Sequence, residues 1–394
     1  MKLSEKLKNG MLLCDGSMGA LLSSMGYATP CPDELAISRP EIIRSIHKSY
    51  LDAGADILIA DCFGSTEPVL NHKGHFGRSA EFTRAAVLLA KEVAEDHALV
   101  ACDMGPTGEF MIPVGAHTFD EVFSWYFEQA KAAKESGADF AFLETHTDLA
   151  ECRAACLAAR EAGLEVIASC TVNEKSRLLT GASIQAFAVS LTAAGATALG
   201  LNCSLGPDQL LNSVKLLRSV SSLPLAVQPN AGLPVTAADG SVSYPFTPEN
   251  MEKGMCRIVE AGASIIGGCC GTRPEHIRRL KSLCGALPES LSVQTEYLAS
   301  AREYCMAKEA LQRPETLIDP EDAYDVDEDT TIIEISDAVF TPEMLLELSA
   351  NTRLPVLLNV SEAEKACSLL RVYPGRMAVK GCTEAAQRYG AYIL

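Results

Sequence analysis

The chain has 394 residues, of which 48% are hydrophobic and 21% charged, a composition typical of a globular protein with one large and one small domain. Its formal net charge of -18 argues against a nucleic-acid partner, because phosphate binding requires a basic surface. The apolar runs are too short to span a bilayer, and the N-terminus lacks a signal-peptide pattern. We therefore expect a cytoplasmic protein with no membrane partner.

Eight short apolar runs alternate with helical patterns as far as about residue 290. Each run is rich in branched or small side chains, which is typical of strands that are buried on both faces. The runs cover residues 11–16, 56–63, 99–105, 140–145, 165–172, 198–203, 225–230 and 264–270. Alternation of this kind predicts parallel strands joined by crossover helices.

Helices are predicted over residues 40–53, 79–95 and 119–136. Gly-Ala pairs at 54–55, 137–138 and 262–263 mark where three of the helices in this region would stop. Eight strands over roughly 270 residues fit a (β/α)8 TIM barrel, whose usual size is about 250 residues. The alternative is an open doubly wound sheet, which often has a glycine-rich phosphate loop after its first strand. The Asp15-Gly16-Ser17-Met18-Gly19 segment lacks the third glycine of that loop, so the barrel is favoured.

The remaining residues predict a small partial α/β domain. We divide the chain into a barrel at 1–290, a helix with an acidic linker at 291–330, and the small domain at 331–394. The linker helix is predicted over 296–312, and an acidic, loop-like segment follows at 314–331. Strands are predicted at 331–336, 355–360 and 376–380, with helices at 342–350, 362–371 and 383–389.

Fifteen cysteines favour metal binding or thiol chemistry, because cysteines stay reduced in the cytoplasm. Cys203 ends the sixth predicted strand, and Cys269 and Cys270 end the eighth. Active sites in such barrels lie at the C-terminal ends of the strands, so the three thiols are expected to converge. Spacing alone supports two interpretations equally: a zinc site, or cysteines buried in the core.

The zinc interpretation carries a chemical consequence. Three protein ligands with one open position are typical of a catalytic zinc site. A free alkyl thiol has a pKa near ~8.5 and is mostly unreactive at neutral pH. Zinc would hold a substrate thiol as a thiolate that attacks an electrophilic methyl group.

Several segments resemble the homocysteine methyltransferase family, which includes the N-terminal module of cobalamin-dependent methionine synthase and enzymes that use betaine or S-methylmethionine. The matching segments, in chain order, are Asp15-Gly16-Ser17-Met18-Gly19, Gly105-Pro106-Thr107-Gly108, Glu144-Thr145, Gly200-Leu201-Asn202-Cys203, Pro229-Asn230-Ala231-Gly232 and Gly267-Gly268-Cys269-Cys270-Gly271-Thr272. The resemblance implies a (β/α)8 barrel with a zinc site made by Cys203, Cys269 and Cys270. It also implies homocysteine as the methyl acceptor and methionine as the product.

The resemblance extends to the substrate site. Asn230 matches the oxygen ligand that some members use when substrate is absent. Glu144 matches the acid that binds the substrate's amino group, since a carboxylate at a strand end can pair with an ammonium. The turn formed by Asp15, Gly16, Ser17 and Met18 matches the loop whose backbone N–H groups bind the substrate carboxylate. Asp15 itself would either hold this loop in place or bind the amino group of the substrate.

One segment departs from the family. Many members have Thr-Asn-Thr-Phe-Gly after the second strand, whereas this chain has Ala60-Asp61-Cys62-Phe63-Gly64. A charged Asp61 at the active face predicts altered recognition of the amino acid. Cys62 is not expected to be a metal ligand.

The methyl donor stays open at this point. The chain has no Asp-x-His-x-x-Gly pattern, so we do not expect it to bind cobalamin itself in that mode. The tail resembles the middle of the pterin-binding barrel that follows this module in methionine synthase, although an unrelated α/β extension explains it equally well. A barrel followed by a truncated tail of this kind favours methylcobalamin, supplied by a separate corrinoid protein, as the donor. The alternatives are direct use of S-methylmethionine or betaine, and a non-catalytic, zinc-stabilised binding subunit. Folate binding is not predicted.

Overall fold

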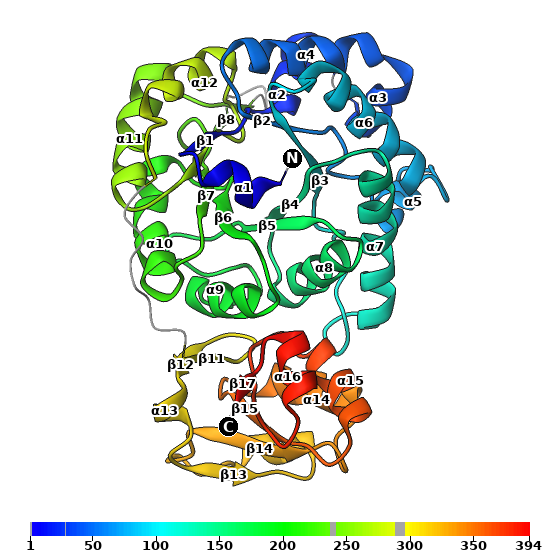
Figure 1. The fold of residues 1–394 in the computed structure, drawn as a ribbon, viewed down its shortest axis with the longest axis vertical. Helices are drawn as coiled ribbons and strands as arrows, with labels where there is room; N and C mark the ends of the chain where they lie inside the picture. Colours follow the sequence, from blue (N-terminus) through cyan, green and yellow to red (C-terminus); the bar gives the residue numbers. More distant parts are fainter. Residues whose placement is uncertain (1, 28, 237–241, 288–295) are drawn as a thin grey trace.

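The computed structural model describes residues 2–27, 29–236, 242–287 and 296–394. Eight parallel strands form one sheet in the order β1-β10-β7-β6-β5-β4-β3-β2, and helices surround it (Figure 1). A bridge between Cys14 and Ile57 joins β1 to β2 and brings the two edges together. The TIM-barrel prediction is therefore confirmed.

All eight predicted strands are present, and most are shorter than the apolar runs. Their bounds are β1 Leu12–Leu13, β2 Ile57–Ile59, β3 Leu99–Met104, β4 Phe140–His146, β5 Glu165–Cys170, β6 Ala198–Asn202, β7 Leu225–Gln228 and β10 Ile265–Ile266. The runs extend further because their last residues turn out of the ladder to form the mouth of the barrel.

The helices between the strands begin and end as the sequence signals indicate. The three predicted ones are α4 (Pro40–Asp52), α6 (Ser79–Ala94) and α7 (Phe119–Glu135), the last starting with a capping box between Thr118 and Glu121. The other long helices are α8 Leu149–Glu161, α9 Ile184–Ala193, α10 Pro207–Val220 and α11 Pro248–Glu260. The shorter ones are α1 Leu3–Leu7, α2 Met18–Ser24, α3 Leu35–Ser38, α5 Glu67–His72 and α12 Pro274–Leu280.

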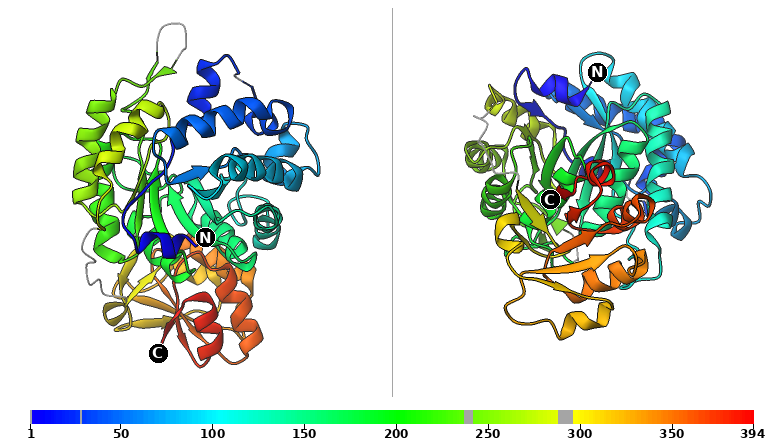
Figure 2. Two further views of the ribbon diagram at one scale, coloured as in Figure 1. Left: turned by 45° about the horizontal axis from the view of Figure 1, so that its top comes forward. Right: turned by 60° about the horizontal axis from the view of Figure 1, so that its bottom comes forward.

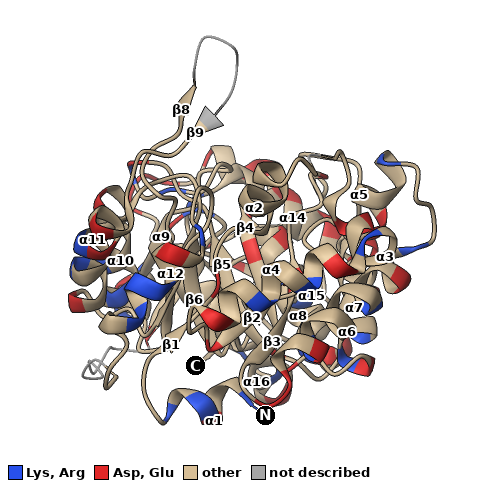
Figure 3. Ribbon diagram, turned by 90° about the horizontal axis from the view of Figure 1, so that it is seen from above, with Lys and Arg blue, Asp and Glu red and all other residues tan. Residues whose placement is uncertain are grey.

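One end of the barrel is closed, and the other carries the loops. Helix α1 lies across the N-terminal ends of the strands, where Leu3 and Leu7 pack into the inner core of the barrel (Figure 1). The Ser4 backbone N–H also donates to Glu165 of β5 over 3.1 Å. At the opposite end, β8 (Val235–Thr236) and β9 (Val242–Ser243) pair antiparallel and project beyond the helices (Figure 3). In the described part of the chain, no helix is long and apolar enough to cross a membrane.

The tail forms a second parallel sheet, whose five strands follow chain order. They are β13 Pro314–Thr316, β14 Ile332–Ser336, β15 Val356–Asn359, β16 Ala378–Lys380 and β17 Tyr392–Ile393. Helices α14 (Pro342–Asn351), α15 (Ala363–Val372) and α16 (Thr383–Tyr389) connect them, as predicted. The sheet takes in β13 from the segment predicted as linker, and the three-part division of the chain stays a prediction.

The prediction of a helix at 296–312 is wrong. This segment forms a β11 (Tyr297–Ala299) and β12 (Tyr304–Met306) hairpin, followed by the short helix α13 (Ala307–Ala310). Ala299 exchanges two backbone hydrogen bonds with Arg376, over 3.1 and 2.8 Å. The side chain of Ser300 accepts from two backbone N–H groups in the turn. These long-range strand partners outweigh the local helical propensity of the segment.

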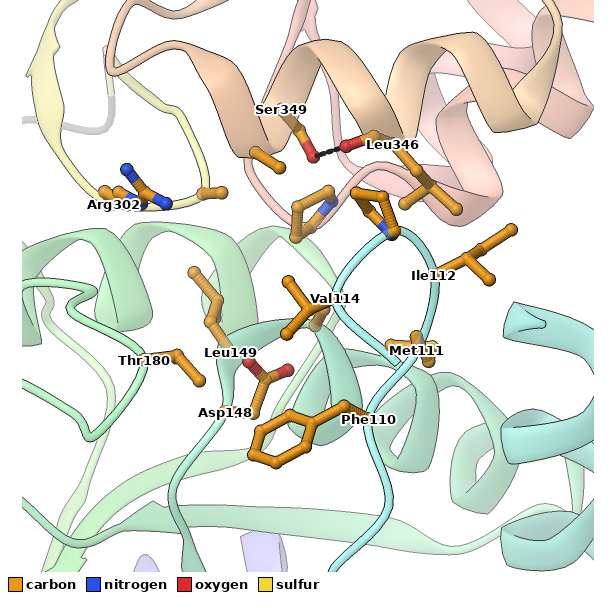
Figure 4. A pocket seen from close by; sticks show the side chains of 15 residues that line it. Phe110, Met111, Ile112, Val114, Asp148, Leu149, Thr180, Arg302, Leu346 and Ser349 are labelled. Carbon is orange, nitrogen blue, oxygen red and sulfur yellow. Dashed lines mark hydrogen bonds between the residues drawn. The ribbon is translucent and has the colours of Figure 1, made fainter. Parts of the chain in front are cut away.

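The tail packs against the side of the barrel that carries α8, α9 and the β3–α7 loop (Figure 1 and Figure 2). In Figure 4, the side chains of Ile112 and Val114 from that loop lie on the side of Leu346 and Ser349 of α14, and Phe110 lies further away, beside Asp148. These residues line a small pocket of about 110 Å³ between the two parts. The tail thus contacts the rim of the barrel rather than its centre.

Candidate metal and thiol site

Two strand ends at the mouth of the barrel have strained backbones. Cys203 and Ser204, which follow β6, have φ of 59° and 55°, and Thr145 at the end of β4 has φ of 58°. Such values are uncommon for residues other than glycine and cluster at functional sites. The Cys203 N–H donates to the Gln228 carbonyl over 3.1 Å, which holds the turned strand end against β7.

The turn after β10 carries the other two cysteines. The Cys269 N–H donates to the Pro229 carbonyl over 2.9 Å, and the Cys270 carbonyl accepts from Ala231 over the same distance. Gly268 allows this path, because a Cβ there would lie 2.3 Å from the Thr272 side chain. The turn is therefore fixed from both sides, and its two thiols are presented at the mouth.

The three predicted cysteines converge. The Sγ atoms of Cys203, Cys269 and Cys270 all lie within 4.8 Å of one another, and those of Cys203 and Cys270 are 3.7 Å apart. Hydrogen bonds from Cys203 and Cys269 lower the pKa of the Cys270 thiol to about 3. Soft thiolates grouped in this way can hold a metal ion. Outside this cluster, Cys256 is exposed.

Asn230 lies in the loop after β7. Its side chain is 2% exposed, and its Oδ1 has no hydrogen-bond partner in the described part of the chain. Its backbone N–H donates to Leu205 over 3.0 Å. A buried amide oxygen without a donor is costly, which indicates that this atom is kept for a ligand.

Glu144 lies next to the cysteines. Its Oε1 accepts from Asn202 Nδ2 over 3.0 Å and lies 3.7 Å from Cys269 Sγ. Asn202 Nδ2 also reaches Thr145 Oγ1 over 2.7 Å, and its Oδ1 accepts from Ser169 Oγ over 2.6 Å. Burial raises the pKa of Glu144. Asn202 therefore positions Glu144, a role that its place in the Asn-Cys motif did not reveal.

The Asp15 to Met18 turn joins three strand ends. Asp15 Oδ2 accepts from the Ile59 N–H over 2.9 Å, and the Asp15 carbonyl accepts from Gly268 over 3.3 Å. Burial raises the pKa of the Asp15 carboxyl well above its usual range. Ser17 caps α2 by accepting from the Ala20 N–H, and its own N–H donates to Thr272 Oγ1 over 3.1 Å. Asp15 thus joins its turn to the ends of β2 and β10, and its predicted roles toward the substrate stay predictions.

A Gly16→Ala substitution is expected to destabilise the protein by about 1–3 kcal/mol, the usual cost of overpacking. Its Cβ would lie 2.8 Å from Thr272 Oγ1 and 3.0 Å from the Tyr50 ring, both of which hold the turn. Chemical denaturation checks the stability, and Gly19→Ala is the matched control because nothing lies within 4 Å of its added Cβ. Equal stability of the two variants would contradict this packing argument.

Asp103 is a further acid at the mouth that the sequence reasoning missed. It lies on β3, is 7% exposed and hydrogen-bonds to Glu144. The available signal was a single charged residue within the buried apolar run 99–105. Asp61 has different neighbours: the charges that act on it are those of Asp33 and Lys73. Its predicted effect on amino-acid recognition stays a prediction.

The fold and the site together define a (β/α)8-barrel protein whose strand ends present three thiols and several buried acids. Residues 12–284, well over half of the chain, match the family model described as homocysteine S-methyltransferase. The chain therefore belongs to the homocysteine S-methyltransferase family, and the resemblance seen in its motifs is confirmed.

Two curated relatives are methionine synthases. The chain is 31% identical over 299 residues to that of Mycobacterium leprae (strain TN) and 30% identical over 299 residues to that of Mycobacterium tuberculosis (strain ATCC 25618 / H37Rv). Each match covers 71% of this chain but only 24% and 25% of the relatives. The chain thus spans about a quarter of the length of these relatives.

Solved structures agree on the fold. The metallated form of the homocysteine methyltransferase MmuM from Escherichia coli matches with a TM-score of 0.60 and 22% identity, covering 71% of this chain and 99% of that one. Its oxidized form matches with a TM-score of 0.59 and 24% identity, covering 69% and 96%.

Proposed function

We propose that this chain transfers a methyl group to the thiol of homocysteine, giving methionine, with zinc as the metal that Cys203, Cys269 and Cys270 hold. The observation that carries the proposal is the convergence of three thiols within 4.8 Å in a member of this family. Tetrahedral zinc with Zn–S bonds of about 2.3 Å requires sulfurs about 3.8 Å apart. The 3.7 Å between Cys203 and Cys270 fits that requirement.

The chain's own residues would orient the amino acid. Glu144 is proposed to bind the substrate ammonium, and Asn230 Oδ1 to fill the fourth metal position until the thiol arrives. Met18 begins α2 and Ser17 is its N-cap, and the first N–H groups of the helix have no partner within it. Since the Ser17 N–H is used by Thr272, the Met18 and Gly19 N–H groups are the ones proposed to bind the carboxylate. When bound, zinc would supply a thiolate from the substrate thiol at neutral pH.

The cavity beside Cys270 supports a large methyl donor. It measures about 590 Å³, and Ser17, Tyr244, Arg273 and Glu275 are among its mostly polar lining residues. Betaine and other quaternary or sulfonium cations favour cages of several aromatic rings, whereas Tyr244 is the aromatic side chain in the described lining. We therefore propose methylcobalamin, carried by a separate corrinoid protein, as the donor. A cytoplasmic location stays a prediction.

X-ray absorption at the zinc edge, with and without homocysteine, tests the thiol chemistry. We expect three sulfur ligands and one oxygen ligand in the zinc-loaded protein, and four sulfur ligands after homocysteine is added. An unchanged sulfur count would contradict thiol activation and would favour a non-catalytic, zinc-stabilised subunit. A donor screen follows: turnover with methylcobalamin but not with S-methylmethionine or betaine is expected, and the reverse would overturn the corrinoid assignment.

A further inference from the structure

Asp103 lies inside the mouth of the barrel. Leu99 and Ala101 of β3 belong to the inner core cluster, together with Phe140 and Phe142 of β4. Side chains alternate along a strand, so Asp103 points to the same interior, two residues closer to the mouth. Its backbone pairs with Phe142 of β4, two residues before Glu144.

The carboxyl group of Asp103 is incompletely satisfied. It hydrogen-bonds to Glu144, yet the described residues donate no hydrogen bond to its Oδ1, which is buried. A buried carboxylate oxygen that receives no hydrogen bond costs free energy unless a ligand supplies the donor. The atom therefore marks a place where a donor group from outside the chain would bind.

The acidic groups around Asp103 Oδ1 favour binding of a cation. Asp15, Asp103 and Glu144 are buried near one another, and Asp15 and Asp103 each feel the charge of Glu144. Among the described residues, no ion pair joins any of the three to a lysine, arginine or histidine. Buried acids of this kind are normally paired. The metal-type cluster in the described chain consists of the cysteines, not of these carboxylates. An organic ammonium therefore suits the acids better than a second metal ion.

We propose that Asp103 is a specificity-determining residue whose Oδ1 accepts a hydrogen bond from the ammonium group of the substrate amino acid. This inference rests on the proposed function. Glu144 and Asp103 then bind the ammonium from two adjacent strands, while the cysteines hold the metal that takes the thiol. The two acids select a thiol that carries an ammonium over one that lacks it, because the second thiol would leave Asp103 Oδ1 without a hydrogen-bond donor.

Calorimetric binding of two thiols to the zinc-loaded protein tests this role. The probes are L-homocysteine and 4-mercaptobutanoate, which has the same thiol and carboxylate but no amine. The Asp103→Asn variant keeps the shape and loses the charge, and Asp103→Ala removes the acceptor. We expect each variant to bind homocysteine about 10-fold or more weakly, the effect of one hydrogen bond to a charged group. The dissociation constant for 4-mercaptobutanoate should differ from that of the wild type by less than about 2-fold in both variants.

Asp337→Asn is the comparison, because Asp337 is also a buried acid, but it lies in the tail and accepts a hydrogen bond from Ser361 Oγ over 2.7 Å. A preference for homocysteine that survives in both Asp103 variants overturns the inference and leaves the proposed function intact. So does a preference that Asp337→Asn loses to the same extent as the Asp103 variants. Wild-type protein that binds neither thiol overturns the proposed function itself, and the inference with it.

Discussion

The Cys270→Ser variant is expected to bind zinc at least on the order of 100-fold more weakly than the wild type, and to lose methyl transfer with the metal. Residues outside the ligand shell already cost about 10- to 100-fold in metal affinity when they are changed, so a lost ligand should cost more. A serine hydroxyl is a harder and far less acidic donor than a thiol. The backbone of the turn should be retained, since the hydrogen bond from Ala231 is to the Cys270 carbonyl.

A competition titration with a chromophoric chelator measures this affinity, and the bound metal is counted after dialysis. Cys203→Ser and Cys269→Ser should behave in the same way, because their thiols belong to the same cluster. Cys256→Ser is the matched control: this cysteine is exposed on α11 and lies outside the cluster. Full zinc stoichiometry and affinity in any of the three cluster variants would show that the ligand assignment is wrong.

The barrel and the cysteine site were predictable because local patterns determine them. Strands that are buried on both faces have continuous apolar runs, and a glycine at positive φ follows each of α4, α7 and α11, at Gly54, Gly137 and Gly262. Once eight strands are assigned, the ends of the sixth and eighth must lie at one face. The convergence of Cys203, Cys269 and Cys270 therefore follows from the strand assignment.

The parts that were missed depend on contacts between distant residues. The hairpin at 297–306 forms because Ala299 finds a partner in Arg376, which no local pattern encodes. Asp103 on β3 and Asn202 on β6 are important because both hydrogen-bond to Glu144 on β4, and the sequence alone does not reveal which oxygen lacks a donor. Local periodicity predicts the elements, whereas the partners of polar side chains require the packed structure.

Arg153 hydrogen-bonds the tail to the barrel. This arginine lies on α8, is 2% exposed, and donates to the carbonyls of Leu370 and Arg371, the first of these over 2.8 Å. Both carbonyls are in the last turn of α15, where no further residue of the helix can satisfy them. Burial lowers the pKa of Arg153 to about 10, so the group stays charged at neutral pH. Arg371 adds an ion pair to Asp120 and lies 4.6 Å from the centre of the Phe123 ring.

The Arg153→Met variant is therefore expected to lose about 3 kcal/mol or more, since two buried carbonyls lose a charged donor and methionine offers none. The loss should be concentrated in the tail, because the carbonyls belong to α15. Hydrogen exchange resolved by segment measures it, and we expect the amides of α15 to exchange faster while those of the barrel strands keep their protection. Arg160→Met is the matched control on the same helix, because Arg160 donates to Ala194 within the barrel. Unchanged exchange in α15 of Arg153→Met would show that other contacts, such as Arg371 on the α7 aromatic rings, hold the tail to the barrel.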